Sequence, residues 1–183
     1  DEAHALSVSS LSRAIETDLA AGRKPAAVVA AIGTTATTGI DPLREIASVC
    51  RTHGLWLHVD AALAGTAMVC PENRSLWDGV DQADSLVLNP HKWLGTGFDL
   101  SAYFVRDVEH LIRVMSTNPS YLRTAQDGLV NNFRDWGIPL GRRMRSLRLW
   151  FLFLDRGLEG MRELVRLDQA SARWLAEQVD GTP

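Results

Sequence analysis

Three short apolar runs, separated by helical and turn patterns, most constrain how this chain can fold. The runs are AAVVAAIG at 26–33, LWLHVD at 55–60 and DSLVLN at 84–89, each bounded by turn residues. Short uninterrupted runs of this kind are typical of strands that are covered on both faces, as in a parallel sheet. The helical pattern PLREIASVCRTHG, with proline in its first turn, lies between the first two runs. We therefore expect an α/β domain with a mostly parallel sheet and flanking helices.

A fourth run, SAYFV at 101–105, predicts an exception to the parallel arrangement. Only the loop NPHKWLGTGFDL separates it from the third run, and this loop is too short to hold a crossover helix. We therefore expect the last two strands to be antiparallel neighbours in a mixed sheet. A first helix is expected with Ser9 or Ser10 as its cap and an end at Gly22. Further helices are expected over 108–115 and from Leu140 onward, with breaks at Gly157 and Gly160.

Size, charge and cysteine content exclude several classes of protein. A length of 183 residues can bury one core, and the formal net charge of -3 argues against a general nucleic-acid binder. The sequence contains no apolar run long enough to span a bilayer and no secretory signal pattern. Cys50 and Cys70 lie in apolar surroundings without the spacing of metal ligands, which is typical of reduced thiols in an intracellular protein. We expect a cytoplasmic protein with no metal site, no nucleic-acid partner and no membrane partner.

Polar and reactive side chains follow the expected strands at the point where each strand ends. Gly33, Thr34 and Thr35 follow the first, His58 and Asp60 end the second, and Asn89, His91 and Lys92 follow the third. Ligands of open α/β sheets bind at the carboxyl ends of parallel strands, so these residues are expected on one rim. Each has an ordinary structural explanation, as a turn former, a helix cap or a structural histidine. Their convergence favours a functional site.

An acid and a lysine on one rim are compatible with pyridoxal phosphate chemistry. A neutral lysine amine can attack a carbonyl to form a Schiff base. An acidic side chain that keeps the pyridine nitrogen protonated is the usual partner of such a lysine. The alanine after Asp60 leaves room for a flat ring beside the chain. Spacing by itself does not single out this chemistry.

Four stretches of the sequence carry a family resemblance: GTTATTGIDPL, LWLHVDAALAGTAMVCPE, ADSLVLNPHKWLGTGFD and WGIPLGRRMRSLRLWF. In this order and with matching gaps, they closely resemble the group II pyridoxal-phosphate-dependent decarboxylases, with the aromatic L-amino acid decarboxylases as the nearest branch. The resemblance implies part of the fold type I (aspartate aminotransferase-like) architecture and pyridoxal 5'-phosphate as cofactor. It also implies a homodimer for the full-length enzyme.

The resemblance assigns roles to the rim residues. Lys92 resembles the lysine that forms the Schiff base with the cofactor, and Asp60 resembles the partner of its pyridine nitrogen. Ala62 resembles the residue packed on one face of the ring, and Thr35 the hydroxyl residue near the phenolic oxygen. Asn89 and His91 resemble residues around the cofactor phosphate, and His91 is also expected to assist near the lysine.

Two further residues match functional positions of the family. Tyr121 lies in a long aperiodic stretch and resembles the mobile-loop tyrosine that protonates the carbon left after carbon dioxide departs. The alternative is an ordinary loop residue. Relatives with phenylalanine there tend to be aldehyde synthases, so tyrosine favours decarboxylation. Gly141 matches a position of the substrate pocket that leaves room for a bulky aromatic ring.

The arginines around Gly141 have a different explanation. Arg142, Arg143, Arg145 and Arg148 fall in an expected helix whose other face is apolar. Clustered arginines can bind phosphate or nucleic acid. A solvated and partly ion-paired helix face at a subunit or domain junction is the favoured interpretation.

The predicted function is decarboxylation of an aromatic L-amino acid to its amine and carbon dioxide. The alternatives are decarboxylation of glutamate, histidine or cysteine sulfinate, aromatic aldehyde synthesis, or a non-catalytic remnant or interaction module that keeps the fold. Compared with the family, 1–115 resembles the second half of the cofactor-binding domain, 116–140 the mobile catalytic loop, and 141–183 helices that lead to a truncated small domain. The resemblance thus implies an internal fragment, for which we expect weak cofactor binding and little activity in isolation.

Overall fold

The computed structural model describes residues 3–117, 119–122 and 124–181. These residues form two compact units. The sheet unit comprises Asp1–Phe104 and Arg145–Pro183, and the loop unit comprises Val105–Met144.

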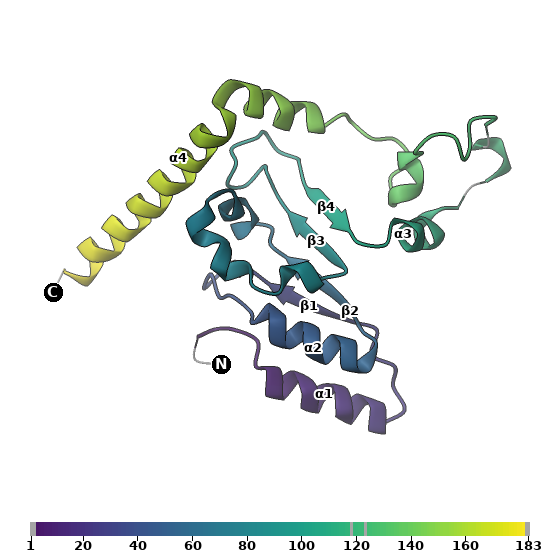
Figure 1. Ribbon diagram of the computed structural model, residues 1–183, viewed down its shortest axis with the longest axis horizontal. Coiled ribbons are helices and arrows are strands. Elements are labelled where there is room, and N and C mark those ends of the chain that lie inside the picture. The colour runs from purple at the N-terminus through teal and green to yellow at the C-terminus, as the bar shows by residue number, and fades with distance from the viewer. Residues whose placement is uncertain (1–2, 118, 123, 182–183) are drawn as a thin grey trace. The chain divides into compact units, whose positions relative to one another are not determined.

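The sheet has four strands in the order β1-β2-β3-β4 (Figure 1). They are β1 (Ala27–Ala31), β2 (Trp56–Asp60), β3 (Ser85–Leu88) and β4 (Ala102–Val105). β2 is parallel to both β1 and β3. β4 runs in the opposite direction beside β3 (Figure 1). The predicted mixed, mostly parallel α/β sheet is therefore confirmed.

Two helices precede the second strand. Helix α1 (Val8–Ala20) begins after Ser7, whose hydroxyl accepts a hydrogen bond from the Ser10 amide at 3.3 Å. The cap therefore lies earlier than the predicted Ser9 or Ser10, since an N-cap side chain must reach an amide two or three residues ahead. Helix α2 (Leu43–His53) ends at Gly54, which adopts φ 64° and turns the chain into β2.

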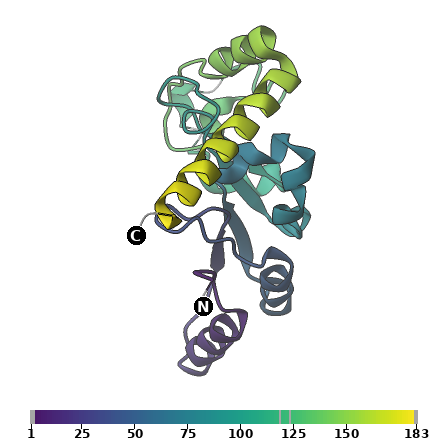
Figure 2. The same ribbon diagram turned by 90° about the vertical axis from the view of Figure 1, so that its left-hand side faces the viewer.

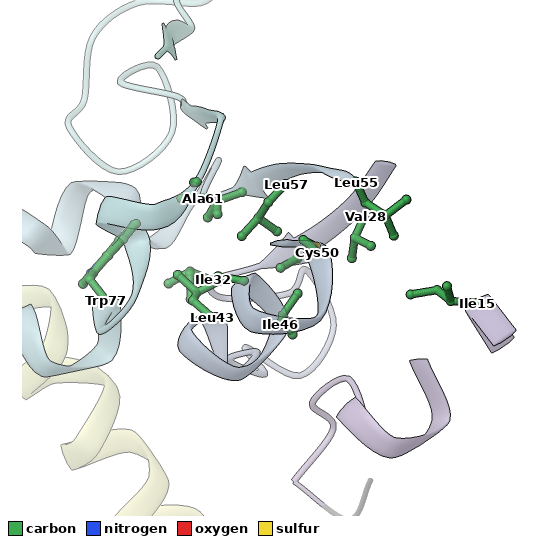
Figure 3. Close-up of a cluster of buried hydrophobic side chains, with 14 residues drawn as sticks. Ile15, Val28, Ile32, Leu43, Ile46, Cys50, Leu55, Leu57, Ala61 and Trp77 are labelled. Carbon is green, nitrogen blue, oxygen red and sulfur yellow. The ribbon is translucent and has the colours of Figure 1, made fainter. Parts of the chain in front are cut away.

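The hydrophobic core lies between one face of the sheet and helix α2 (Figure 3). Val28 on β1 and Leu57 on β2 point into it, opposite Leu43 and Ile46 of α2. Val29, on the other face of β1, is 60% exposed. The prediction that this strand is covered on both faces is therefore wrong. The contacting helix α2 packs only against one face, and a run of alanine and valine is compatible with either arrangement.

Three short 3-10 helices connect β2 to β3: η1 (Ala64–Val69), η2 (Pro71–Trp77) and η3 (Val80–Gln82). The Asp84 carboxylate then accepts a hydrogen bond from the Leu57 amide at 2.7 Å, which fixes the start of β3 against β2. Cys50 and Cys70 are both buried and free, as predicted. Burial raises the pKa of both thiols, so they remain protonated.

The chain of the sheet unit ends in helix α4 (Ser146–Asp180), which bends at Gly157 (Figures 1 and 2). Gly157 adopts φ 62° and ψ -179°, so the predicted break there is confirmed. The predicted break at Gly160 is wrong, because this glycine keeps helical geometry. The helix also begins at Ser146 and not at Leu140, so that Arg148 is the only one of the four clustered arginines inside it. No helix in the described part of the chain is long and apolar enough to cross a membrane.

The loop unit contains little regular structure. Helix α3 (Val108–Met115) matches its prediction and is capped by Asp107, whose side chain accepts from the His110 amide at 2.8 Å. Beyond it lie the short 3-10 helices η4 (Ser120–Leu122) and η5 (Phe133–Trp136). The predicted aperiodic stretch is therefore confirmed as irregular wherever it is described.

Candidate active site

A cavity of about 270 Å³ lies at the carboxyl ends of the parallel strands. Its lining consists of Ala31, Gly33, Thr34, Thr35, Asp60, Ala62, Leu63 and Lys92. Four of the predicted site residues therefore meet in one cavity, although they come from three separate strand ends: Thr35, Asp60, Ala62 and Lys92.

Strand register directs Asp60 to this cavity. Asp60 is the last residue of β2 and pairs with Ala31 of β1 and Val87 of β3. Side chains alternate along a strand, so the buried Val59 points into the core and Asp60 points away from it. The Asp60 carboxylate accepts a hydrogen bond from the Ala62 amide at 3.0 Å. This contact turns the chain sharply after β2 and brings Ala62 into the cavity wall.

The end of β1 approaches the start of η1 closely. Gly33 adopts φ +80°, and a Cβ atom added to it would lie 2.7 Å from the Cβ of Ala64. Thr34 stabilises the following turn, since its hydroxyl accepts from the Gly39 amide at 2.9 Å and lies 2.8 Å from the Thr37 hydroxyl. Thr34 thus has a structural role in the turn, whereas Thr35 is exposed at the cavity.

The lysine loop (Asn89–Leu100) carries Lys92 to the rim. The Asn89 amide donates to the carbonyl of Ala62 at 3.0 Å, and the Lys92 amide donates to the carbonyl of Asn89 at 2.9 Å. His91 Nδ1 lies 3.1 Å from the amide nitrogen of Leu100 and 2.6 Å from its carbonyl oxygen. This ring nitrogen therefore connects the start of the loop at His91 with its end at Leu100. Neither Asn89 nor His91 lines the cavity, and their predicted role around a phosphate stays a prediction.

The residues of the cavity fit pyridoxal phosphate. Lys92 provides an amine for an aldehyde and Asp60 a carboxylate for a protonated ring nitrogen, while Ala62 and Gly33 leave space for a flat ring. The Asn89 Oδ1 atom is buried and has no hydrogen-bond partner among the described residues. A buried polar atom without a partner is unusual, and a bound ligand is one explanation for it.

Tyr121 and Gly141, the other two predicted site residues, belong to the loop unit. Tyr121 lies in η4 and is 80% exposed. Gly141 has open space where a side chain would start.

Asp127 organises the loop unit and was not predicted from the sequence. It accepts hydrogen bonds from the amide and hydroxyl of Thr124 at 3.2 and 3.0 Å, and from Asn132 at 3.0 Å. Arg134 forms an ion pair with it at 3.2 Å and also donates to the carbonyl of Leu122, next to Tyr121. The amide of Thr124 is the main reason why the pKa of Asp127 is lowered. The Asp-Gly pair at 127–128 is a turn signal that could have drawn attention to this residue.

Asp41 is a second residue that the sequence did not reveal. Its carboxylate is buried and accepts from the amides of Ala31 and Leu6, both at 2.7 Å. It therefore fixes the last residue of β1 just before the cavity. The Asp-Pro pair at 41–42 predicted only the start of a helix.

His58 belongs to a polar network beside Asp60 and does not line the cavity. Its Nδ1 atom lies 2.8 Å from the hydroxyl of Ser85, which also accepts from the indole of Trp56 at 2.8 Å. Burial lowers the pKa of His58, and the negative charge of Asp60 partly opposes this shift. His58 therefore has a structural role on the face of β2 that also carries Asp60.

Residues 1–183 match the model described as the pyridoxal-dependent decarboxylase conserved domain. The chain belongs to this family. The predicted resemblance to group II decarboxylases of the aromatic branch is confirmed, and so is pyridoxal 5'-phosphate as the cofactor of the family.

Individual relatives agree with the family match. The chain is 47% identical over 168 residues to the aromatic-L-amino-acid decarboxylase of Bos taurus, covering 91% of this chain and 34% of the relative. It is 40% identical over 183 residues to the histidine decarboxylase of Mus musculus, covering 100% of this chain and 28% of the relative. The crystal structure of Oryza sativa TDC with PLP and tryptamine matches with a TM-score of 0.94 and 38% identity, covering 98% of this chain and 37% of that one. The chain thus spans about a third of the length of its relatives.

Proposed function

We propose that this chain forms part of a pyridoxal-phosphate-dependent decarboxylase that converts an aromatic L-amino acid to its amine and carbon dioxide. The observation that carries the proposal is the presence of Lys92 and Asp60 in one cavity at the rim of the sheet. The family match supports the same conclusion.

Four residues of the cavity and Tyr121 of the loop unit each have a definite task in this proposal. When bound, pyridoxal phosphate supplies an electron-accepting ring that stabilises the charge left on the substrate's α-carbon. Lys92 would hold the aldehyde carbon through its amine, and the Asp60 carboxylate would keep a proton on the ring nitrogen. Ala62 would pack on one face of the ring and Thr35 would lie near its phenolic oxygen. Tyr121 would donate a proton to the substrate carbon after carbon dioxide has left.

The aromatic substrate class is supported by sequence likeness and by space at Gly141. The bovine aromatic-L-amino-acid decarboxylase is 47% identical to this chain and the mouse histidine decarboxylase 40%. Gly141 carries no side chain that would fill a pocket for a large ring. Histidine, glutamate and cysteine sulfinate remain the alternative substrates, and aldehyde synthesis remains the alternative reaction.

The domain assignment and the cellular setting belong to the same proposal. Residues 1–115 would form the second half of the cofactor-binding domain, 116–140 the mobile catalytic loop, and 141–183 the helices that lead to a small domain. The complete enzyme would act as a cytoplasmic homodimer.

Cofactor binding provides the first test. The sequence has two lysines, Lys24 and Lys92. Adding pyridoxal phosphate should produce the visible absorbance of a lysine-bound cofactor, weakly because the chain covers about a third of its relatives. Lys92→Ala should abolish this band, and the matched variant Lys24→Ala should retain it. A band that survives Lys92→Ala, or that never forms, would instead support a non-catalytic protein that keeps the fold.

The substrate is tested with the complete reading frame that contains this chain. Release of amine and carbon dioxide is measured with dopa, 5-hydroxytryptophan, tryptophan, tyrosine, phenylalanine, histidine, glutamate and cysteine sulfinate. If the proposal is correct, the aromatic substrates should have the highest kcat/KM. A higher value for histidine, glutamate or cysteine sulfinate would contradict it, as would release of an aldehyde.

A further inference from the structure

Helix α4 contacts the lysine loop at two places. The indole of Trp93 donates to the carboxylate of Asp168 at 2.8 Å, across 75 residues of sequence. At the other end of the loop, Arg148 donates to the carbonyls of Gly97 and Phe98 at 3.1 and 3.0 Å. Arg145, which precedes α4, forms an ion pair with Asp99 at 2.8 Å. These two arginines thus bind the lysine loop, and the ion pair of Arg145 agrees with the predicted partly ion-paired face.

The turn of α4 that carries Asp168 is itself firmly anchored. Val165 is fully buried against Ala67 and Cys70, which lie in and just after η1. Gln169 exchanges hydrogen bonds with Asn73 at 3.3 and 3.4 Å. Asp168 therefore lies between two contacts that fix the helix to the segment following Asp60. Its carboxylate is a fixed acceptor for the indole of Trp93.

Both neighbours of Lys92 are held by their side chains. His91 is bonded to the backbone of Leu100, and Trp93 is bonded to Asp168. The first contact is local, whereas the second reaches a distant helix. The position of Lys92 in the cavity depends on both, because the backbone of one residue cannot move without its neighbours.

A second cavity gives Trp93 room to move when this contact is absent. It has a volume of about 680 Å³ and borders Lys92, Trp93 and Asp168. Its remaining lining is mostly apolar, so it can accept an indole ring. A displaced Trp93 would shift the backbone of Lys92 away from the cavity that contains Asp60.

We propose that Asp168 is a positioning residue for Lys92 that acts through the indole of Trp93. The inference rests on the proposed function, since it assumes that Lys92 is the lysine that binds the cofactor. Asp168→Ala removes the acceptor and Trp93→Phe removes the donor but keeps an aromatic ring. Asp168→Asn keeps an acceptor oxygen and is the conservative rescue. Asp155→Ala is the matched control, because the Asp155 side chain on the same helix is 79% exposed and pairs with its neighbour Arg156 at 3.9 Å.

Cleavage by a lysine-specific endoproteinase tests the order of the loop without any cofactor. One net hydrogen bond of this kind corresponds to a change of about fivefold in a local opening equilibrium. Cleavage after Lys92 should therefore be about fivefold faster in Asp168→Ala and in Trp93→Phe, at unchanged melting temperature. The double variant should be no faster than either single variant. Asp168→Asn and Asp155→Ala should match the unchanged chain, and equal rates in all variants would overturn the proposal.

Reductive trapping tests the orientation of the amine. The chain is treated with pyridoxal phosphate and borohydride, and the adducts on Lys92 and Lys24 are quantified by peptide mass spectrometry. The ratio of Lys92 to Lys24 adducts should fall about fivefold in Asp168→Ala and Trp93→Phe and recover in Asp168→Asn. A ratio that stays constant in both variants overturns the positioning role. A ratio near one in the unchanged chain overturns the proposed role of Lys92, while the cleavage rates still decide whether Asp168 orders the loop.

Discussion

Family resemblance assigns chemistry to two regions, the cavity rim of the sheet unit and the Tyr121 segment (116–140) of the loop unit. These two regions are held together by different kinds of contact. At the rim, hydrogen bonds join residues far apart in sequence, such as Asp41 with Leu6 and Trp93 with Asp168. In the Tyr121 segment, the partners of Asp127 lie within seven residues of it. Side chains there are largely exposed, with Ile138 at 93%.

This difference indicates that the two regions are stabilised in different ways. The rim is held by the cooperative core, so its geometry persists as long as the unit is folded. The Tyr121 segment is held by local polar contacts at the surface, and such segments open at low free-energy cost. The proposed roles of Lys92 as a fixed residue and Tyr121 as a mobile one are compatible with these different kinds of support.

A pair of glycine substitutions should give the largest effect and the sharpest contrast. Gly33 and Gly128 both adopt positive φ, at +80° and +86°, but only at Gly33 would an added Cβ atom meet a neighbour, at 2.7 Å. Gly33→Ala adds overpacking to backbone strain and should lower the free energy of unfolding by about 2–5 kcal/mol. Gly128→Ala should cost only the strain, about 1 kcal/mol. Urea unfolding measures both, and equal costs would contradict the comparison.

A pair of aspartate substitutions should give the next largest effect. Asp41→Ala leaves the partly buried amides of Ala31 and Leu6 without this acceptor, which should lower the free energy of unfolding by about 2–3 kcal/mol. Asp127→Ala should leave global unfolding nearly unchanged and instead accelerate proteolysis between Leu122 and Arg134. Urea titration and limited proteolysis distinguish these outcomes. A large loss of global stability in Asp127→Ala would show that the two units are not energetically separate.

Acid should weaken the two regions at different pH. Burial lowers the pKa of His58 below its ordinary 6.5, so protonation favours the unfolded chain. The contribution of His58 to the stability of the sheet unit is therefore fully present above pH 6.5 and is lost as the pH falls through the folded pKa. Hydrogen bonding lowers the pKa of Asp127 below 3.8, so the contacts of the loop unit should persist until the pH falls below that value. Melting temperatures against pH should be flatter in His58→Gln, and an unchanged slope would contradict this assignment.

Tyr121→Phe should have the smallest effect on folding. The side chain is 80% exposed, so the free energy of unfolding should change by less than about 0.5 kcal/mol. In the complete enzyme, however, loss of the phenolic proton donor should reduce amine formation about 100-fold or more. Chemical denaturation and product analysis measure the two effects. An equal rate of amine release would remove Tyr121 from the proposed mechanism.

Strand ends were predictable from the sequence because short apolar runs with clear boundaries leave few choices of register and direction. The meeting of Asp60 and Lys92 follows from that topology. Contacts such as Trp93 with Asp168 were not predictable, because no local pattern links residues 75 positions apart. Gly157 and Gly160 could not be distinguished either, since both are glycines in a helical pattern and only one adopts a left-handed backbone.

The register of β2 has a consequence for how reliably the site forms. Val59 is fully buried and Asp60 is exposed, and the two point to opposite faces of the sheet. If β2 slipped by one residue against its neighbours, the carboxylate would enter the apolar core and the valine would take its place at the rim. Burying an unpaired carboxylate is strongly unfavourable. The charge of Asp60 therefore also disfavours the wrong register during folding, since a chain in that register would have to bury a carboxylate in its core.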